Sequence, residues 1–210
     1  MKNNYHQALY FNNYYHIFSR ANGNEKLFFS EENYRYFLRK LHFHTSDICQ
    51  IYAYTLMPNH FHLLVKIKDE KAIINAFTDY KKKEYDVHND DLSDFIMQRF
   101  SNFLNGYTKA VNKRQNRKGA LFMDYIKRSI ANDTADIIKF MFYIHKNAIH
   151  HGVTQKLGQW KYDSYNTYLS NMSTKLMRKE GIELFGSKAS FVEFHQQEIV
   201  RKLEFIDINL

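Results

Sequence analysis

The chain has 210 residues, a formal net charge of +8 and an aromatic content of 17%. These values limit the class of protein to which it can belong. Its length suffices for one well-buried domain. Abundant cationic and aromatic side chains favour a nucleic-acid partner, although a basic protein without a polyanionic ligand has the same composition. The only cysteine, Cys49, excludes an intramolecular disulfide, and the N-terminus lacks the apolar core of a signal peptide. No apolar stretch approaches the roughly 20 residues that span a bilayer, so we expect a cytoplasmic protein without a membrane partner.

The first part of the chain predicts a strand, a helix and a strand pair. Residues Tyr14–Arg20 are aromatic and β-branched and end at a turn signal, which predicts a strand. Ser30 is a suitable N-cap for a helix that runs to about Thr45. The apolar runs Gln50–Met57 and Phe61–Ile67 follow, with the only proline, Pro58, at the turn between them. These two runs predict a pair of antiparallel strands.

The middle of the chain is less regular. Residues 69–94 are rich in charge, and their weak helical pattern predicts a helical or mobile insertion. A firmer pattern predicts a helix over Ser93–Lys113. After a basic loop, the partial alternation of Leu121–Ile130 indicates another strand.

A last core helix is expected to start at Asp133 or Thr134, either of which can cap it, and to end before Gly152. The order βαββαβα then predicts an α+β fold of the ferredoxin-like type, in which helices pack on one face of an antiparallel sheet. Beyond this core, a C-terminal extension includes one further candidate helix at Ser190–Phe205.

Two histidines stand two apart in a run that otherwise predicts a strand. Successive strand residues point to opposite faces, so His60 and His62 share one face and Phe61 points to the other. Both imidazoles can therefore bind one ion, and imidazole suits Mn, Fe, Zn, Ni or Cu, whereas Mg²⁺ prefers more oxygen ligands. The pattern also fits two solvated histidines on an exposed strand face. A metal site would need a third ligand from elsewhere in the chain.

The late helix carries a second candidate pair. Its apolar stripe consists of Ile137, Met141, Ile144 and Ala148, with Phe140 beside them, and should pack on the sheet. Tyr143 and Asn147 are four apart, so they are neighbours one turn along the helix, at the edge of that stripe. The same spacing recurs elsewhere, as in Tyr80 with Glu84, and a tyrosine with its ring in the core is the commoner alternative.

Three segments in a fixed order resemble the single-tyrosine HUH transposases, in particular the IS200-like and REP-associated tyrosine transposases. They are Tyr54–Val65 (YTLMPNHFHLLV), Gly119–Arg128 (GALFMDYIKR) and Tyr143–Val153 (YIHKNAIHHGV). The resemblance implies that His60 and His62 are the HUH pair, that Tyr143 is the nucleophile and that Asn147 is the third ligand of a divalent ion, Mg²⁺ or Mn²⁺. Ala148 departs from the family, in which proline often follows the asparagine.

The resemblance also implies an activity and a domain organisation. Residues 1–168 would form the catalytic domain, and residues 169–210 an extension to which we assign no role. The enzyme would cleave and rejoin single-stranded DNA near hairpins through a 5′-phosphotyrosine intermediate, in DNA transposition. The expected partners are single-stranded or hairpin DNA and a second copy of the chain in a homodimer, with nucleoid association when DNA is bound.

Cationic side chains of the later half are expected to bind the DNA backbone. They are Lys109, Lys113, Arg114, Arg117, Lys118, Lys127 and Arg128. Tyr107 and Tyr125 lie between them in sequence and can stack on unpaired bases, although core packing is the alternative for each. A phenol has a pKa of about 10, so a metal ion or a cation such as Lys146 is expected to favour the phenolate of Tyr143.

Two other functions remain open from the sequence. The chain can be a domesticated protein that binds hairpin DNA without transposing it. Alternatively, it can be a metal-dependent phosphodiesterase whose nucleophile is water rather than Tyr143. Replacing Tyr143 by phenylalanine would spare the phosphodiesterase and abolish the transferase.

Overall fold

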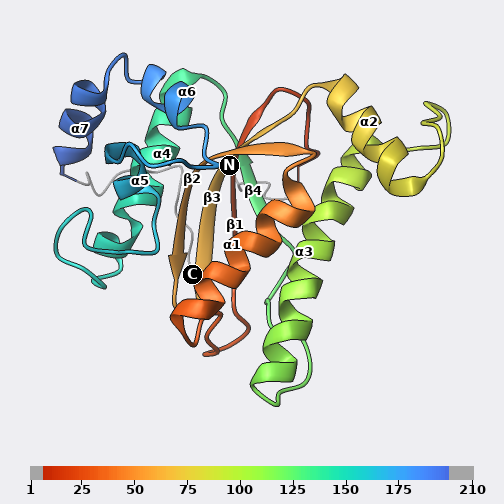
Figure 1. Cartoon of the computed structure of the whole chain (residues 1–210), viewed down its shortest axis with the longest axis horizontal. Coiled ribbons are helices and arrows are strands. Elements are labelled where there is room, and N and C mark those ends of the chain that lie inside the picture. The colour runs from red at the N-terminus through yellow and green to blue at the C-terminus, as the bar shows by residue number, and fades with distance from the viewer. Residues whose placement is uncertain (1–6, 199–210) are drawn as a thin grey trace.

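The computed structural model describes residues 7–198, in which helices cover a single antiparallel sheet (Figure 1). Within these residues the sheet has four strands in the spatial order β2-β3-β1-β4. The strands are β1 (Tyr14–Arg20), β2 (Cys49–Met57), β3 (His60–Ile67) and β4 (Lys127–Ile130). The helices are α1 (Glu31–Thr45), α2 (Glu70–Lys81), α3 (Leu92–Arg114), α4 (Thr134–His150), α5 (Tyr165–Leu169), α6 (Arg178–Glu183) and α7 (Lys188–Gln196). The predicted α+β class with an antiparallel sheet is confirmed.

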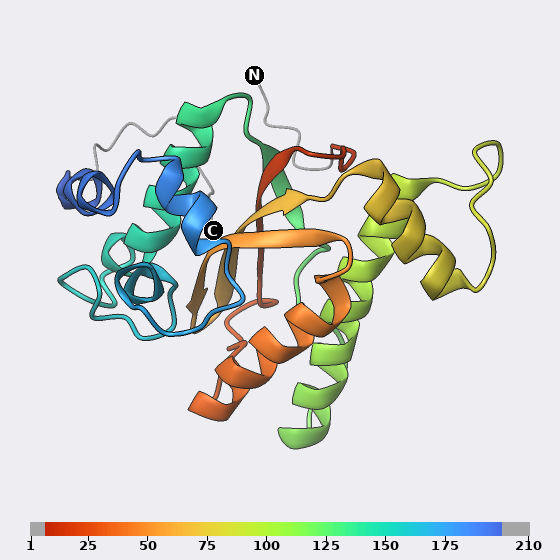
Figure 2. The same ribbon diagram turned by 45° about the horizontal axis from the view of Figure 1, so that its top comes forward.

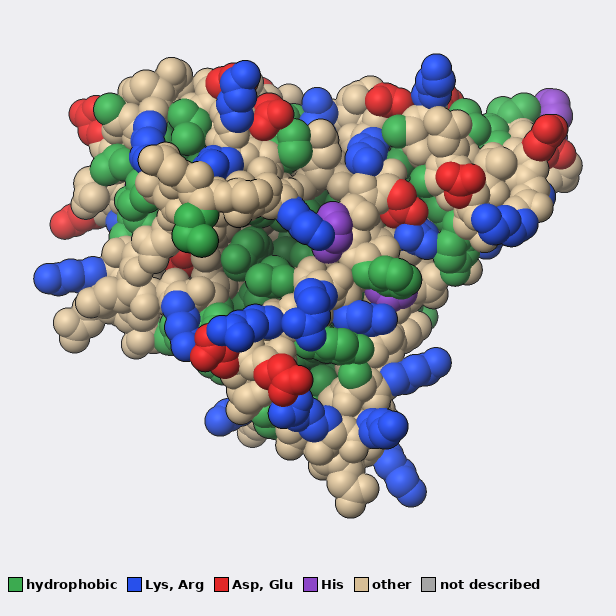
Figure 3. Space-filling model, in the orientation of Figure 1, with side chains coloured by type: hydrophobic (Ala, Val, Ile, Leu, Met, Phe, Trp, Pro, Cys, Tyr) green, Lys and Arg blue, Asp and Glu red, His purple; other side chains and the backbone are tan. Residues whose placement is uncertain are grey.

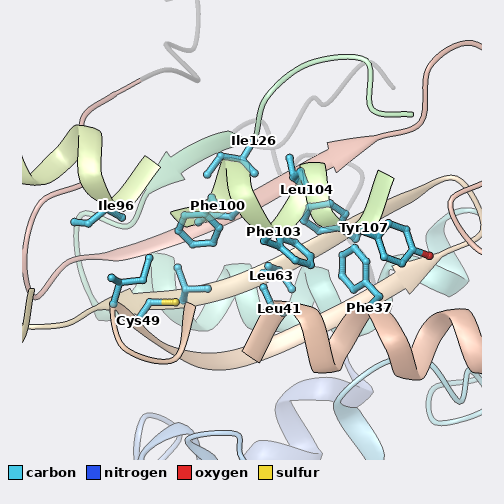
Figure 4. Close-up of a cluster of buried hydrophobic side chains, with 14 of the residues drawn as sticks. Phe37, Leu41, Cys49, Leu63, Ile96, Phe100, Phe103, Leu104, Tyr107 and Ile126 are labelled. Carbon is cyan, nitrogen blue, oxygen red and sulfur yellow. The ribbon is translucent and has the colours of Figure 1, made fainter. Parts of the chain in front are cut away.

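One face of the sheet packs against α1 and α3 and forms an aromatic core (Figure 4). On β3, Phe61 points to this face because it alternates with the histidines on either side. Its ring lies 5.1 Å from that of Phe37 on α1, which in turn lies 4.8 Å from Phe103 on α3. Tyr107 of α3 is also fully buried here, and its hydroxyl donates to the carbonyl of Leu27. The centre of this face is therefore filled by side chains.

The opposite face of the sheet is covered by α4, whose apolar stripe packs on β2 and β3 (Figure 2). Met141 and Ile144 are fully buried there, in one cluster with Tyr52 of β2 and Leu64 of β3. The expected packing of helices on one face holds for α1 and α3, whereas α4 covers the opposite face. The reason is that α1 and α3 fill the first face, while apolar residues on the second face offer α4 a surface of its own.

The predicted strand over Leu121–Ile130 forms a ladder only from Lys127 onward. Leu121 and Phe122 are both buried, which breaks the alternation that a paired strand needs. Phe122 makes only an isolated bridge with Ala21. The other predicted strands agree with β1, β2 and β3 to within one residue.

The predicted insertion contains an ordered helix, α2. Asp69 caps its first turn by accepting a hydrogen bond from the amide of Ala72, and Lys82 ends it in a left-handed conformation with φ 57°. At α4, Asp133 rather than Thr134 is the N-cap, and its carboxylate accepts from the amide of Asp136.

The C-terminal extension packs against α4. In this extension α7 begins after Ser187 and ends at Gln196, and its buried side chains are Phe191 and His195. The predicted helix over Ser190–Phe205 is therefore seen as far as Gln196, and residues 199–205 lie outside the described part of the chain. No helix between residues 7 and 198 is long and apolar enough to cross a membrane.

Candidate metal and nucleophile site

Strand β3 presents its two histidines to α4. His60 and His62 are 5% and 0% exposed, and their ring centroids are 5.1 Å apart. They share the face that Phe61 avoids, as the period of two predicts. The alternative of two solvated histidines on an exposed strand is excluded by their burial.

Helix α4 brings the second predicted pair over the same place. Asn147 is fully buried, and its Oδ1 lies 3.1 Å from Nε2 of His60. One turn earlier, Tyr143 is 7% exposed, and its ring centroid is 5.5 Å from that of His62. The four residues therefore meet, although the two pairs are more than 80 positions apart in sequence.

The hydrogen bonds of His60 indicate whether a cation fits between these groups. Burial lowers the pKa of His60 to about 4, so the ring is neutral at pH 7 and carries one N–H. That proton is donated either to Oδ1 of Asn59 at 2.8 Å or to Oδ1 of Asn147 at 3.1 Å. In this orientation of the two amides, one amide oxygen faces a nitrogen lone pair. A cation bound to the lone pair and the oxygen of Asn147 would convert this repulsion into attraction.

One further atom fits the same conclusion. Nε2 of His62 is buried and has no hydrogen-bond partner among residues 7–198. Nδ2 of Asn147 also lacks a partner there, but an amide NH₂ group donates and does not bind a cation. A buried polar atom without a partner costs about 1–3 kcal/mol, and an ion bound by His62 would satisfy its nitrogen. In the same part of the chain no three His, Cys, Asp or Glu side chains form a metal-binding group. The donor set is instead two imidazoles and one amide oxygen, which fits a divalent ion with open positions.

Sequence reasoning missed a third histidine, His16 on β1. Its Nε2 lies 2.8 Å from Nδ1 of His62, and the side chain is 1% exposed. Burial lowers the pKa of His16 to about 3 and that of His62 well below its usual value. Only the pairing of β1 with β3 brings these rings together, so no signal in the sequence singled out His16. His151, just after α4, also contacts the site, with its ring centroid 4.8 Å from that of His60.

The two predicted cations of β4 point to different faces. Lys127 is paired with Phe18, the neighbour of His62, and therefore shares the histidine face. Arg128 is paired with Ile17 on the α1 and α3 face, is 7% exposed and donates to the carbonyl of Gln7. A cation that was not predicted, Arg20, is paired with His60 and lies on the histidine face.

The other predicted cations lie at the end of α3 and in the following loop. Lys109, Lys113 and Lys118 are exposed. Arg114 is paired with Glu32 at 2.6 Å, and Arg117 with Glu25.

The remaining sequence candidates have separate places. Tyr125 is 68% exposed, whereas Tyr107 belongs to the core. Lys146 donates from Nζ to the carbonyl of Gln197, so its ammonium contacts the C-terminal extension.

A separate hollow opens between α1, β2 and the segment that precedes α6 (Figure 3). Its volume is about 390 Å³, and its lining is largely apolar, with residues such as Leu41, Ile51 and Met177. It contains none of the predicted site residues, because it lies at the outer edge of β2.

Fold and site together define a mixed α/β protein with a histidine-bearing sheet face beneath a tyrosine helix. The family described as IS200-like transposase matches residues 9–129, which include His60 and His62 and end before Tyr143. This match spans more than half of the chain, so the chain belongs to the IS200-like transposase family.

A solved structure has the same fold. It is that of a REP-associated tyrosine transposase bound to a REP hairpin, with a TM-score of 0.59 and 14% identity over 80% of this chain and 86% of that one. Comparison with curated proteins gives no significant match. The predicted family is thus confirmed.

Proposed function

We propose that this chain is a DNA strand transferase that cleaves and rejoins single-stranded DNA near hairpins, with Tyr143 as its nucleophile. The observation that carries the proposal is the meeting of β3 and α4. The ring of Tyr143 lies 5.5 Å from that of His62, and Asn147, one turn later, contacts His60 at 3.1 Å. Membership of a transposase family supports the same reaction class.

The proposed chemistry exchanges one phosphodiester for another. The phenol oxygen of Tyr143 forms a bond to phosphorus, the bond to the 3′ oxygen breaks, and the phenol proton is lost to solvent while the leaving oxygen takes up a proton. The product is a 5′-phosphotyrosine and a free 3′-hydroxyl. Since no phosphodiester is lost to water, another 3′-hydroxyl can reverse the step and rejoin the strands without an energy source.

His60, His62 and Asn147 would hold a divalent ion, Mg²⁺ or Mn²⁺. Such an ion supplies Lewis-acid polarisation of the scissile phosphate when it is bound. The chain itself contributes rigidity, because all three side chains are at least nine-tenths buried and their positions are set by β3 and α4. Burial also excludes water from the side of the site that faces the sheet.

The substrate class is proposed from charge and from the fold relative, which is bound to a REP hairpin. Lys127 and Arg20 share the histidine face and would bind the phosphates nearest the site. Exposed Lys109, Lys113 and Lys118, together with Arg114 and Arg117, would extend the contact, whereas Arg128 stays in the core. A homodimer remains part of the proposal, and sedimentation of the protein with and without DNA tests it.

Covalent capture tests the proposal. The protein is incubated with Mn²⁺ or Mg²⁺ and a labelled pool of single-stranded oligonucleotides that carry randomised hairpins and flanks, so that the recognised site need not be known. We expect a denaturant-resistant protein–DNA adduct that requires the metal and disappears in Tyr143→Phe. Tyr80→Phe is the matched control, because Tyr80 also has a polar residue four positions later but lies exposed on α2.

The two alternatives give different products in the same assay. Metal-dependent cleavage that persists in Tyr143→Phe without an adduct would identify a phosphodiesterase that uses water. Retention of hairpin DNA with neither cleavage nor adduct, in the presence of either metal, would identify a domesticated binding protein.

A further inference from the structure

His16 lies beside His62 in the sheet and contacts the rings of both His62 and Tyr143, the second at a centroid distance of 5.8 Å. The rings of His16 and His62 are nearly parallel, with centroids 5.0 Å apart and an interplanar angle of 20°, and Nε2 of His16 is 2.8 Å from Nδ1 of His62. The His16 ring is also held between Phe18 and Phe140, at centroid distances of 5.0 and 5.3 Å. Its orientation is therefore fixed by packing on three sides.

A hydrogen bond between two neutral imidazoles has two forms. If His16 donates, His62 carries its own proton on Nε2, and that nitrogen has no lone pair to offer. If His62 donates from Nδ1, its Nε2 carries the lone pair. The two forms have the same heavy-atom geometry but opposite consequences, because Nε2 of His62 is the buried atom that lacks a partner within the described residues.

A second buried histidine pair in the same chain provides the contrast. Nε2 of His195 and Nδ1 of His145 are 2.9 Å apart, and the other two ring nitrogens are bonded to Oγ of Ser164 and the carbonyl of Phe191. Every ring nitrogen of that pair has a protein partner, so the pair only joins α4 to α7. In the pair formed by His16 and His62, the buried Nε2 of His62 has no hydrogen-bond partner among residues 7–198.

We propose that His16 is a positioning residue that accepts the Nδ1–H of His62 and so leaves the lone pair of His62 on Nε2, available to the ion that His60 and Asn147 would also bind. A metal-binding imidazole commonly has its other N–H bonded to a fixed acceptor, which selects the tautomer and orients the ring. His16 does this with a neutral side chain instead of a carboxylate. This inference rests on the proposed function insofar as the lone pair is meant for a metal ion.

Nitrogen NMR of the metal-free protein, labelled with ¹⁵N in its histidines, tests the tautomer without metal or DNA. Protonated and unprotonated ring nitrogens have well-separated shifts, and we expect His62 to be protonated on Nδ1 only. His16→Phe keeps a ring but removes the acceptor, and should move the proton of His62 to Nε2. His16→Gln restores an acceptor and should keep it on Nδ1.

Mn²⁺ affinity without DNA, read from the free-ion EPR signal, is the second measurement. We expect His16→Phe to weaken binding about 10- to 100-fold and His16→Gln to recover most of it. The matched control, His195→Phe, also breaks a buried bond between two histidines and should leave Mn²⁺ affinity unchanged.

Each result separates the two proposals. A wild-type His62 protonated on Nε2, or a tautomer unchanged in His16→Phe, would overturn the role of His16, and the wild-type spectrum decides this even where a variant does not fold. The expected tautomer in a protein that binds no Mn²⁺ would instead refute the proposed metal site and leave the assignment of His16 intact.

Discussion

The two faces of the sheet bury different kinds of side chain. The face against α1 and α3 is filled by rings and aliphatic groups such as Phe37, Phe61 and Phe103. The face against α4 has buried polar groups on the strands and on the helix, and those without a partner among residues 7–198 are Oγ1 of Thr55, Nε2 of His62 and Nδ2 of Asn147. The helices on the first face also bury unpartnered atoms, Nε2 of His44 and Nε of Arg99, but none of these lies on a strand of the sheet. On the second face, a bound ion would satisfy Nε2 of His62 and so offset part of the cost in stability.

Phe61→Ala tests most directly how much the apolar face contributes to stability. This substitution removes a fully buried ring from the middle of β3 and should lower the free energy of unfolding by about 3–5 kcal/mol. Urea unfolding in EDTA measures the loss. At temperatures where the variant is still folded, Mn²⁺ affinity should match that of the wild type, and a large decrease in affinity would show that the two faces are not independent.

The polar face also contains a carboxyl group that is costly to ionise. Asp163 bridges to Thr55, the residue paired with His62, and burial raises the pKa of Asp163 to about 7 although the amide of Tyr165 donates to it. A raised pKa favours the protonated folded state, so this contribution to stability is present below about pH 4 and is lost as the pH rises to 7.

Asp163→Asn should therefore stabilise the protein more at pH 8 than at pH 5, by about 2–3 kcal/mol from the size of the pKa shift. Asparagine keeps the acceptor for the Tyr165 amide and cannot ionise. Urea unfolding at the two pH values measures the difference. The exposed Asp79→Asn is the control, and equal effects of both substitutions at both pH values would contradict the assigned burial cost.

Asn147→Leu separates the effect of the polar face on stability from its effect on metal binding. The substitution exchanges a buried amide for an apolar group of similar volume on a helix. In EDTA the free energy of unfolding should stay within about 1 kcal/mol of the wild type, since the lost amide had an unpartnered nitrogen and leucine favours helix. Mn²⁺ affinity measured by calorimetry should fall by at least about tenfold. A strongly destabilised variant with intact affinity would make Asn147 a structural residue only.

Local spacing was enough to predict several parts of this arrangement. The period of two in β3 put His60 and His62 on one face and Phe61 on the other, and the period of the helix joined Tyr143 to Asn147. The turn at Pro58 also follows from a short stretch of sequence, and another such stretch limits the N-cap of α4 to Asp133 or Thr134. These features are predictable because neighbouring residues on one backbone determine them.

The sequence by itself thus determined β1, β2 and β3, the helices α1, α3 and α4, the family resemblance and the two pairs that make up the candidate site. It did not predict the short helices α5 and α6 or the late start of β4. Only the tertiary structure decided that α4 lies on the face opposite α1 and α3, that His16 lies beside His62, and that Arg128 is buried while Arg20 faces the site. The physical reason is that strand order and helix placement depend on contacts between distant segments. Residue spacing determines the direction in which a side chain points from its own helix or strand. The packing of helices and strands determines which other residues that side chain contacts.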